Sequence, residues 1–308
     1  MIFVEILLLA LGFFMLVKGA DWFVDGTAGI AEKFGIPQLV VGLTIVAMGT
    51  SAPEAAVSIT AALKGTADIA VGNVVGSNIL NILVILGLTG LITSVAVQKS
   101  TLFYEIPYML LVTVVLMVMG MMGNSINFVE GIIFWVMFIL YLAYLFVLAK
   151  KGKQEEESKE TRKIWLLLGY AVVGGVVVVL GSNIAVDSAT AIAEIIGLSE
   201  KFIGLTIVAL GTSLPELVTS VTAARKGNAD IAIGNIVGSN IFNILFVLGT
   251  SALIIPITFE SSFVIDSIIA IAAGVLLWIS TIKTKKLTRP WGIVMLLCYA
   301  AYFVYLLF

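Results

Sequence analysis

Residues 42–60 read GLTIVAMGTSAPEAAVSIT, and residues 204–222 read GLTIVALGTSLPELVTSVT. Aligned from these first glycines, the two copies are identical at 35 of 51 positions without a gap, at a constant offset of 162. The same offset relates Asp25 to Asp187, so the likeness begins well before the quoted stretches. The chain therefore contains an internal duplication.

The composition predicts a protein that lies within a lipid bilayer. Of its 308 residues, 60% are hydrophobic and 12% are charged, and the mean hydropathy is +1.15. A soluble domain could not bury that much apolar surface. Apolar runs long enough to cross ~30 Å of hydrocarbon recur along almost the whole chain, which leaves no room for a separate soluble domain.

Breaks at glycine, proline and charged residues predict an all-α integral membrane fold with ten transmembrane helices. The predicted spans are 3–31, 37–63, 69–94, 102–122, 127–149, 164–194, 200–224, 231–256, 261–282 and 290–307. Residues 150–163, KKGKQEEESKETRK, form the longest hydrophilic stretch, and we interpret them as a linker. Residues 1–149 are then a first five-helix repeat and residues 164–308 a second one, together forming one integrated transmembrane unit.

Five is an odd number of spans, so the second repeat should enter the membrane from the opposite face. The two repeats are then inverted relative to each other, an arrangement found in many secondary transporters. Loops on the linker side would hold fourteen lysines and arginines, and loops on the other side only Lys64 and Lys201. Because positive loops stay in the cytoplasm, we expect a multi-pass cell-membrane protein with a cytoplasmic linker and both termini outside.

Several classes of function are disfavoured by what the sequence lacks. It has no histidine and a single cysteine, Cys298, so clusters for soft or borderline metals are missing and any bound cation should be held by oxygen. An enzyme is not expected, because no nucleophile stands beside a recognisable base. Nucleic-acid binding has no support, and we expect neither a cofactor nor an obligate protein partner.

Glu54 and Glu216 stand near the middle of the second and seventh predicted spans. A charge at that depth costs from ~3 to more than ~10 kcal/mol, so each carboxylate needs a partner, water or a bound cation. A hydrogen bond between helices or a protonated carboxyl group are the alternatives. The surrounding stretches contain no lysine, arginine or histidine, and a transported cation suits two matched carboxylates best.

Pro53 and Pro215 precede these glutamates, and each should kink or break its helix because it lacks an amide hydrogen. Carbonyl groups near Ala47 and Ala209 would then be freed to face a cation, although the glycines beside them also permit close helix packing. Hydroxyl and carboxylate side chains share the same helix faces. These are Thr50, Ser51 and Glu54 in the first half and Thr212, Ser213 and Glu216 in the second. Oxygen donors of these kinds bind Na⁺ and Ca²⁺.

The third and eighth spans carry GNVVGSNILNI and GNIVGSNIFNI. Serine and asparagine recur there four residues apart and so share one helical face. The ligand candidates are Ser77, Asn81, Ser239 and Asn243. For Asn73, Asn78, Asn235 and Asn240, hydrogen bonding between helices is an equally good interpretation.

The paired GTSAPE and GTSLPE segments, each followed by GNxxGSNIxNI, resemble the two alpha repeats of the cation/Ca²⁺ exchanger superfamily, in particular the compact prokaryotic sodium/calcium exchangers. The resemblance implies an antiporter that exchanges Ca²⁺ for Na⁺ by alternating access. It implies Ca²⁺ binding by Glu54, Glu216, Thr50 and Thr212, and Na⁺ sites at Ser51, Ser77, Ser213, Ser239 and the carbonyls of Ala47 and Ala209. Asn81 and Asn243 would complete the centre.

One position departs from that resemblance, since an aspartate can stand in the family where this chain has Asn243. Two ionised glutamates balance one Ca²⁺ or two Na⁺, whereas the family favours three Na⁺. The driving ion thus stays open among Na⁺, H⁺ and K⁺, and a passive cation channel is a further alternative. For the first and sixth spans, which carry Asp25 and Asp187, we expect either sliding against the other helices or contact of these aspartates with interfacial water.

Overall fold

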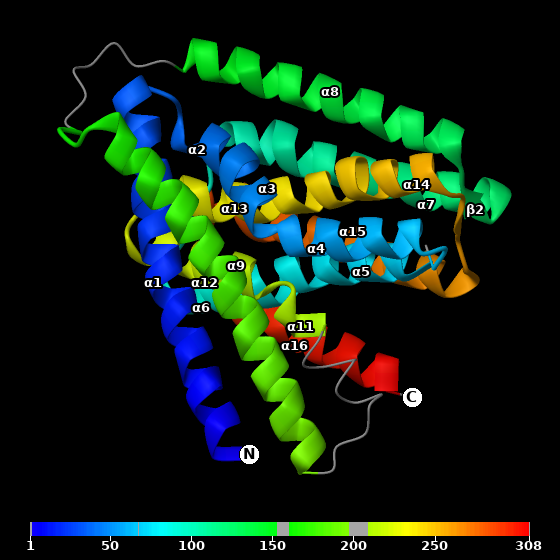
Figure 1. Cartoon of the computed structure of the whole chain (residues 1–308). Coiled ribbons are helices and arrows are strands. Elements are labelled where there is room, and N and C mark those ends of the chain that lie inside the picture. Colours follow the sequence, from blue (N-terminus) through cyan, green and yellow to red (C-terminus); the bar gives the residue numbers. More distant parts are fainter. Residues whose placement is uncertain (1, 67, 153–159, 197–208, 308) are drawn as a thin grey trace.

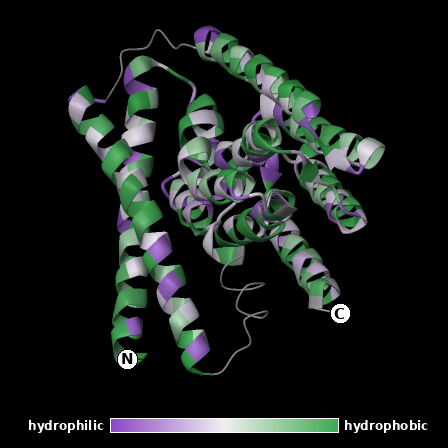
Figure 2. Cartoon of the chain, turned by 45° about the vertical axis from the view of Figure 1, so that its right-hand side comes forward, coloured by the Kyte–Doolittle hydropathy of each residue, from purple (hydrophilic) through white to green (hydrophobic). Residues whose placement is uncertain are grey.

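The computed structural model describes residues 2–66, 68–152, 160–196 and 209–307. Within these residues the chain is helical and apolar, as a multi-pass membrane protein requires. Among the described residues, eight helices are long and apolar enough to cross a membrane, or nine when the bent pair 38–50 and 52–63 is counted as one span. Figure 2 shows hydrophobic residues along the whole length of the long helices.

The first half of the chain contains the following elements. They are α1 (Ile2–Phe34), α2 (Gln38–Val41), the π-helical turn η1 (Gly42–Val46), α3 (Ala47–Thr50), α4 (Ala52–Leu63), α5 (Asp68–Leu80), the π-helical turn η2 (Asn81–Leu86), α6 (Gly87–Ile92), β1 (Val95–Ala96), the π-helical turn η3 (Thr101–Glu105), α7 (Ile106–Gly123), β2 (Ser125–Ile126) and α8 (Phe128–Lys151).

The described part of the second half has a similar order, although no π-helical turn like η3 precedes α15. It contains α9 (Ile164–Ile195), α11 (Ala209–Gly211), α12 (Leu214–Arg225), α13 (Ala229–Phe242), the π-helical turn η5 (Asn243–Leu248), α14 (Gly249–Ile254), β3 (Ile257–Thr258), α15 (Ser261–Ile282), β4 (Lys286–Leu287) and α16 (Arg289–Leu307). Each of the ten predicted spans contains helix, with bounds that differ from the prediction by a few residues. The start of the seventh span, residues 200–208, and linker residues 153–159 lie outside the described residues.

Helices α1 and α9 lie side by side as a separate two-helix layer against the remaining bundle (Figure 1). They run antiparallel, because Gly12 lies against Ala185, and Gly26, two heptads later, lies against Ala171. A Cβ atom built on Gly26 would come within 2.4 Å of the Ala171 backbone nitrogen. Glycine at these positions is therefore what allows the two backbones to touch along their length.

The centre of the bundle is formed by α13 and by the helix α5–η2–α6. In Ala229–Ile254, which comprises α13, η5 and α14, almost all residues of the most apolar stretch are buried. In Ile69–Ile92, which comprises most of α5 together with η2 and α6, most of them are buried. Helix α13 packs on η1 through Gly238, where a Cβ atom would come within 2.7 Å of the carbonyl oxygen of Leu43. This close contact brings a central helix of the second half against a broken helix of the first.

The expected break at Pro53 is present. Helix α3 ends at Thr50, Ser51 leaves the helical conformation with φ −81° and ψ 8°, and α4 resumes with Pro53 in its first turn at an angle of 51°. Proline suits a first turn, where its missing amide hydrogen has no helical acceptor. The second half has the same break, with Ser213 between α11 and α12.

The described residues also contain four two-residue strands, which lie in loops and leave the fold all-helical. Strand β1 pairs antiparallel with β4, with Val95 opposite Leu287, and β2 pairs with β3, with Ser125 opposite Thr258. Each strand has only two residues, so it carries no alternating pattern that a sequence could reveal. Each pair joins a loop of the first half to a loop of the second.

Candidate cation site

The two intramembrane glutamates lie at the helix breaks. Glu54 is in the first turn of α4 and Glu216 in the first turn of α12, and both side chains have 0% exposure. The two carboxyl groups lie close enough to interact electrostatically. The first turn of a helix presents unpaired amide groups and the positive end of the helix dipole, so it stabilises a carboxylate at this position. The breaks thus place both charges in one buried centre.

Each glutamate is held by a serine from the opposite half. The hydroxyl of Ser51 donates to Oε1 of Glu216 over 2.8 Å, and that of Ser213 donates to Oε1 of Glu54 over 3.2 Å. Both serines are the residues at which the helices break. The reciprocal bonds fix the two breaks against each other, which requires both halves to be folded together.

Thr50 and Thr212 flank the serines. Thr212 lies beside Glu54 and Thr50 beside Glu216, each within side-chain contact. Thr50 is buried, and its hydroxyl lies 2.9 Å from Oδ1 of Asn235 on α13. Thr212 is partly exposed and borders a cavity, so it lies where the site meets that cavity.

Four asparagines form a second layer of reciprocal bonds between the halves. Nδ2 of Asn78 donates to the carbonyl of Asn240 over 3.1 Å, and Asn240 returns the same bond to Asn78. Oδ1 of Asn240 accepts from Nδ2 of Asn81 over 2.9 Å, and Oδ1 of Asn78 accepts from Nδ2 of Asn243 over 3.2 Å. For Asn78 and Asn240, hydrogen bonding between helices is therefore the interpretation that the contacts support. It also orients the amides of Asn81 and Asn243.

Four buried oxygens in this centre have no hydrogen-bond partner among the residues that the structure describes. They are Oε2 of Glu54, Oε2 of Glu216, Oδ1 of Asn81 and Oδ1 of Asn243. A buried acceptor without a partner is costly and rare in a native protein. The two carboxylate oxygens occupy equivalent positions in the two halves, and so do the two amide oxygens. Hard cations such as Ca²⁺ bind oxygen ligands of both kinds.

The remaining candidates lie on the same central helices. Ser239 is buried on α13, and its hydroxyl donates to the carbonyl of Ala47 over 3.3 Å. Ser77 is buried on α5, which packs against α11. Ala209 begins α11, and nothing is described of its side chain. The carbonyl of Ala47 also accepts from the amide of Ser51 over 3.0 Å. It is therefore less available to a cation than the predicted helix break implies.

Asn73 and Asn235 have a structural role. Nδ2 of Asn73 donates to the hydroxyl oxygen of Ser58 over 2.9 Å, and Asn235 forms the same bond with Ser220. Each also reaches the backbone carbonyl of the glutamate in its own half, over 3.3 and 3.4 Å. These bonds join the broken helix of each half to its central helix and so hold each glutamate in place.

A cavity of about 470 Å³ adjoins the site. It is lined by Pro53 and Ala56 of α4, by Asn183 and Asp187 of α9, and by Thr212. Asn183 and Asp187 lie in the half of α9 that is distant from the linker. The cavity therefore approaches the carboxylates from the end of the molecule opposite to the linker.

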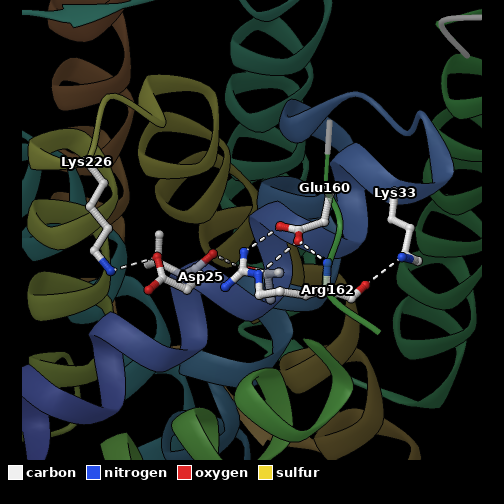
Figure 3. A network of polar contacts seen from close by, with 7 residues as sticks. Asp25, Lys33, Glu160, Arg162 and Lys226 are labelled. Atoms are coloured by element: carbon white, nitrogen blue, oxygen red, sulfur yellow. Dashed lines mark hydrogen bonds and ion pairs between the residues drawn. The ribbon is translucent and has the colours of Figure 1, made fainter. Parts of the chain in front are cut away.

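The C-terminal part of α1, which lies near the linker, is held by ion pairs (Figure 3). Lys226, which follows α12, forms ion pairs with Asp25 at 2.8 Å and Asp21 at 3.3 Å. The offset of 162 relates Lys226 to Lys64 and Asp25 to Asp187. Within the described part of the chain, Lys64 and Asp187 form no ion pair.

The linker contributes a second contact on the same end of α1. Nζ of Lys33 donates to the carbonyl of Arg162 over 2.5 Å. Arg162 forms an ion pair with Glu160 at 2.5 Å and lies close enough to Asp25 to interact with it electrostatically. Hydrogen bonds from Arg162 lower the pKa of Glu160 to about 2, so this pair stays charged at neutral pH.

The fold and the site together define a multi-pass membrane protein with an acidic, oxygen-lined centre between two halves. The model of the sodium/calcium exchanger protein family matches residues 4–147 and 166–308. The chain belongs to this family, whose members are transporters rather than enzymes.

Individual relatives agree with that assignment. The chain is 37% identical to the sodium/calcium exchanger MaX1 of Methanosarcina acetivorans over all of both chains. It is 38% identical to the putative antiporter CaxA of Alkalimonas amylolytica over 96% of both. Among solved structures it resembles the sodium-calcium exchanger NCX_Mj, with 32% identity, a TM-score of 0.86 and 98% of each chain covered.

Proposed function

We propose that this protein is a secondary active antiporter that exchanges Ca²⁺ for Na⁺ by alternating access at a centre containing Glu54 and Glu216. The observation that carries the proposal is a buried centre with two carboxylates in which four oxygens have no partner among the described residues. Membership of the sodium/calcium exchanger family supports the choice of ions. In this proposal Ca²⁺ and Na⁺ are cargo, and the protein uses no cofactor.

The proposed ligands are oxygen atoms around the two helix breaks. Glu54 and Glu216 would hold Ca²⁺ together with Thr50 and Thr212, and Asn81 and Asn243 would complete the centre. Na⁺ would be bound by Ser51, Ser77, Ser213, Ser239 and the carbonyls of Ala47 and Ala209. Ca²⁺ takes about six to eight oxygen ligands, more than the two carboxylates supply, so neutral oxygens have to contribute.

The proposed topology has ten spans in two inverted repeats, residues 1–149 and 164–308, with the linker 150–163 in the cytoplasm and both termini outside. Strand pairing supports the inversion. Strands β1 and β2 lie at opposite ends of the segment η3–α7, and the offset of 162 makes β3 the equivalent of β1. Yet β3 pairs with β2 rather than lying with β1. This pairing supports an arrangement in which equivalent loops lie at opposite ends of the bundle, as inverted repeats require.

Alternating access would involve two equivalent ion pairs that form in turn. The pair of Lys226 with Asp25 closes the linker end of α1, while the cavity beside Asp187 leaves the other end open. When α1 and α9 move relative to the bundle, Lys64 would pair with Asp187 and Lys226 would release Asp25. The glycine-lined contact between α1 and α9 supports their movement as one unit.

Uptake of Ca²⁺ into proteoliposomes under separately imposed Na⁺, K⁺ and H⁺ gradients tests the proposed exchange. We expect uptake to follow the Na⁺ gradient and to cease in Glu54→Gln and in Glu216→Gln. Uptake driven by a pH gradient without Na⁺ would instead identify a Ca²⁺/H⁺ antiporter. Flux that needs no counter-ion would identify a passive channel.

A further inference from the structure

A second buried carboxylate lies away from the proposed cation centre. Glu105 ends η3, directly before α7, and its side chain is 1% exposed. The hydroxyl of Tyr144 on α8 donates to its Oε1. Its Oε2 has no partner among the described residues, and no lysine or arginine among them pairs with it. A carboxylate within a membrane span needs a compensating group, and the uncharged hydroxyls near it, those of Tyr144 and Thr101, supply only part of it.

Four tyrosines surround this carboxylate. The rings of Tyr108 and Tyr141 stack with centroids 5.5 Å apart, and those of Tyr104 and Tyr144 lie 6.4 Å apart. Tyr108 donates its hydroxyl hydrogen to the carbonyl of Met137 over 2.9 Å. The hydroxyl of Tyr141 is buried and, within the described residues, unpartnered, and it lies close enough to Glu105 to interact with it electrostatically.

Glu105 and all four tyrosines line one cavity of about 540 Å³ between α7 and α8. Phe103, Leu111 and Leu140 form its exposed apolar rim, so the cavity opens where lipid chains would lie. Tyr144 stands seven residues before the end of α8, about 10 Å at 1.5 Å per residue. The end of the cavity at Tyr144 thus lies where the head groups and first acyl carbons of one leaflet would be in the proposed topology.

We propose that this cavity binds the primary ammonium group of an amphiphile, which donates to Oε2 of Glu105 and to the hydroxyl oxygen of Tyr141 while its hydrocarbon tail leaves between α7 and α8. Tyrosine faces attract organic cations, and the carboxylate supplies the opposite charge. A primary ammonium fits better than a quaternary one because only the former can donate hydrogen bonds to the two unpartnered oxygens. The proposal is independent of ion exchange.

Native mass spectrometry of the full chain with equimolar dioleoyl phosphatidylethanolamine, phosphatidylcholine and phosphatidylglycerol tests this site. We expect wild type to retain the ethanolamine lipid about tenfold over the other two, as one charge-assisted hydrogen bond implies. Glu105→Gln should abolish the preference. Tyr141→Phe, which keeps the ring, should reduce it.

Asp266→Asn is the matched control, because Asp266 also accepts from a tyrosine, Tyr302, over 2.9 Å but lies outside this cavity. It should leave the preference unchanged. A second arm uses decylammonium and a nonionic decyl alcohol, with the melting temperature as the readout. A different result would be that wild type shows no lipid preference, while decylammonium, but not decyl alcohol, raises its melting temperature and leaves that of Glu105→Gln unchanged. This result would assign the site to free amphiphilic amines. The proposal is overturned if neither ligand distinguishes wild type from Glu105→Gln, or if Asp266→Asn has the same effect.

Discussion

At the scale of single residues, the proposed site depends on how a carboxylate is held without a lysine or arginine. Glu54 and Glu216 each keep one oxygen bonded to a serine of the opposite half and leave the other unpartnered within the described residues. The bonded oxygen fixes the direction of the carboxylate, and the other is then oriented for a cation. Preorganisation of this kind lowers the cost of binding.

The serine bonds lead to a first prediction. Ser51→Ala removes the 2.8 Å hydrogen bond to Glu216 and should weaken Ca²⁺ binding by about ten- to hundredfold, since a hydrogen bond to a charged group contributes about 1.5–3 kcal/mol. Calorimetric titration with Ca²⁺ measures the effect. Ser280→Ala is the matched control, because Ser280 is also buried but its hydroxyl donates to the carbonyl of Leu277 on α15, outside the site. Equal losses in both variants would contradict the assigned role of Ser51.

Asn243 leads to a second prediction. Its amide oxygen is unpartnered within the described residues and adds no charge to the two glutamates, so Asn243→Asp should alter the ion balance. A third carboxylate either attracts an additional monovalent cation or takes up a proton because of repulsion. The membrane voltage at which Na⁺ and Ca²⁺ gradients balance should therefore shift or become pH-dependent. An identical voltage in both proteins at every pH would remove Asn243 from the site.

At the scale of elements, the ion pairs at the ends of α1 and α9 lead to a third prediction. Lys226→Gln releases Asp25 and should favour the state that is closed at the cavity end. Labelling of Ala56→Cys, in the cavity, by an impermeant maleimide should then slow about two- to fivefold, as an exposed ion pair of up to about 1 kcal/mol implies. The background is Cys298→Ser, because Cys298 is exposed.

Two comparisons control this experiment. Lys226→Arg retains the charge and should restore the labelling rate, while Lys64→Gln should not slow it, because Lys64 forms no ion pair with any residue that the structure describes. Faster labelling in Lys226→Gln would show that the pair does not hold the linker end closed. A disulfide between Lys64→Cys and Asp187→Cys should arrest exchange if these positions meet in the other state.

The elements also show what sequence patterns could and could not predict. The breaks before Pro53 and Pro215 were predictable, because proline acts on its own helix. The bond from Ser51 to Glu216 was not, because it joins residues 165 positions apart and depends on packing of the two halves. The sequence alone could not decide whether Asn78 binds a cation or forms a hydrogen bond between helices, because its partner Asn240 lies 162 positions away. The pairing of Lys226 with Asp25 was missed, although the conserved offset of Lys64 and Lys226 was a usable signal.

At the scale of the whole molecule, the internal duplication determined most of the expected architecture. Ten predicted segments all contain helix, because long apolar runs in a membrane protein have few alternatives to helix. The side-by-side placement of α1 and α9 was not expected from the sequence, since it depends on glycines such as Gly12 and Gly26 that lie among many others. The four two-residue strands were equally unexpected.

A fourth prediction concerns topology. In a Cys298→Ser background, Lys151→Cys, beside the linker, should react with impermeant maleimide only from the cytoplasmic side, and Lys64→Cys only from outside. The reason is that inverted repeats with a positively charged linker place these two positions on opposite faces. Labelling of both from the same side would contradict the inverted arrangement.

The central claim is that Ca²⁺ and Na⁺ compete for one centre formed by Glu54 and Glu216. Equilibrium binding of radioactive Ca²⁺ to the purified protein, with and without Na⁺, tests it without requiring turnover. We predict that Na⁺ displaces Ca²⁺ from wild type, and that Glu54→Gln and Glu216→Gln each lose binding while Asp266→Asn retains it. Ca²⁺ binding that persists in both glutamine variants, or that Na⁺ leaves unchanged in wild type, would contradict the account.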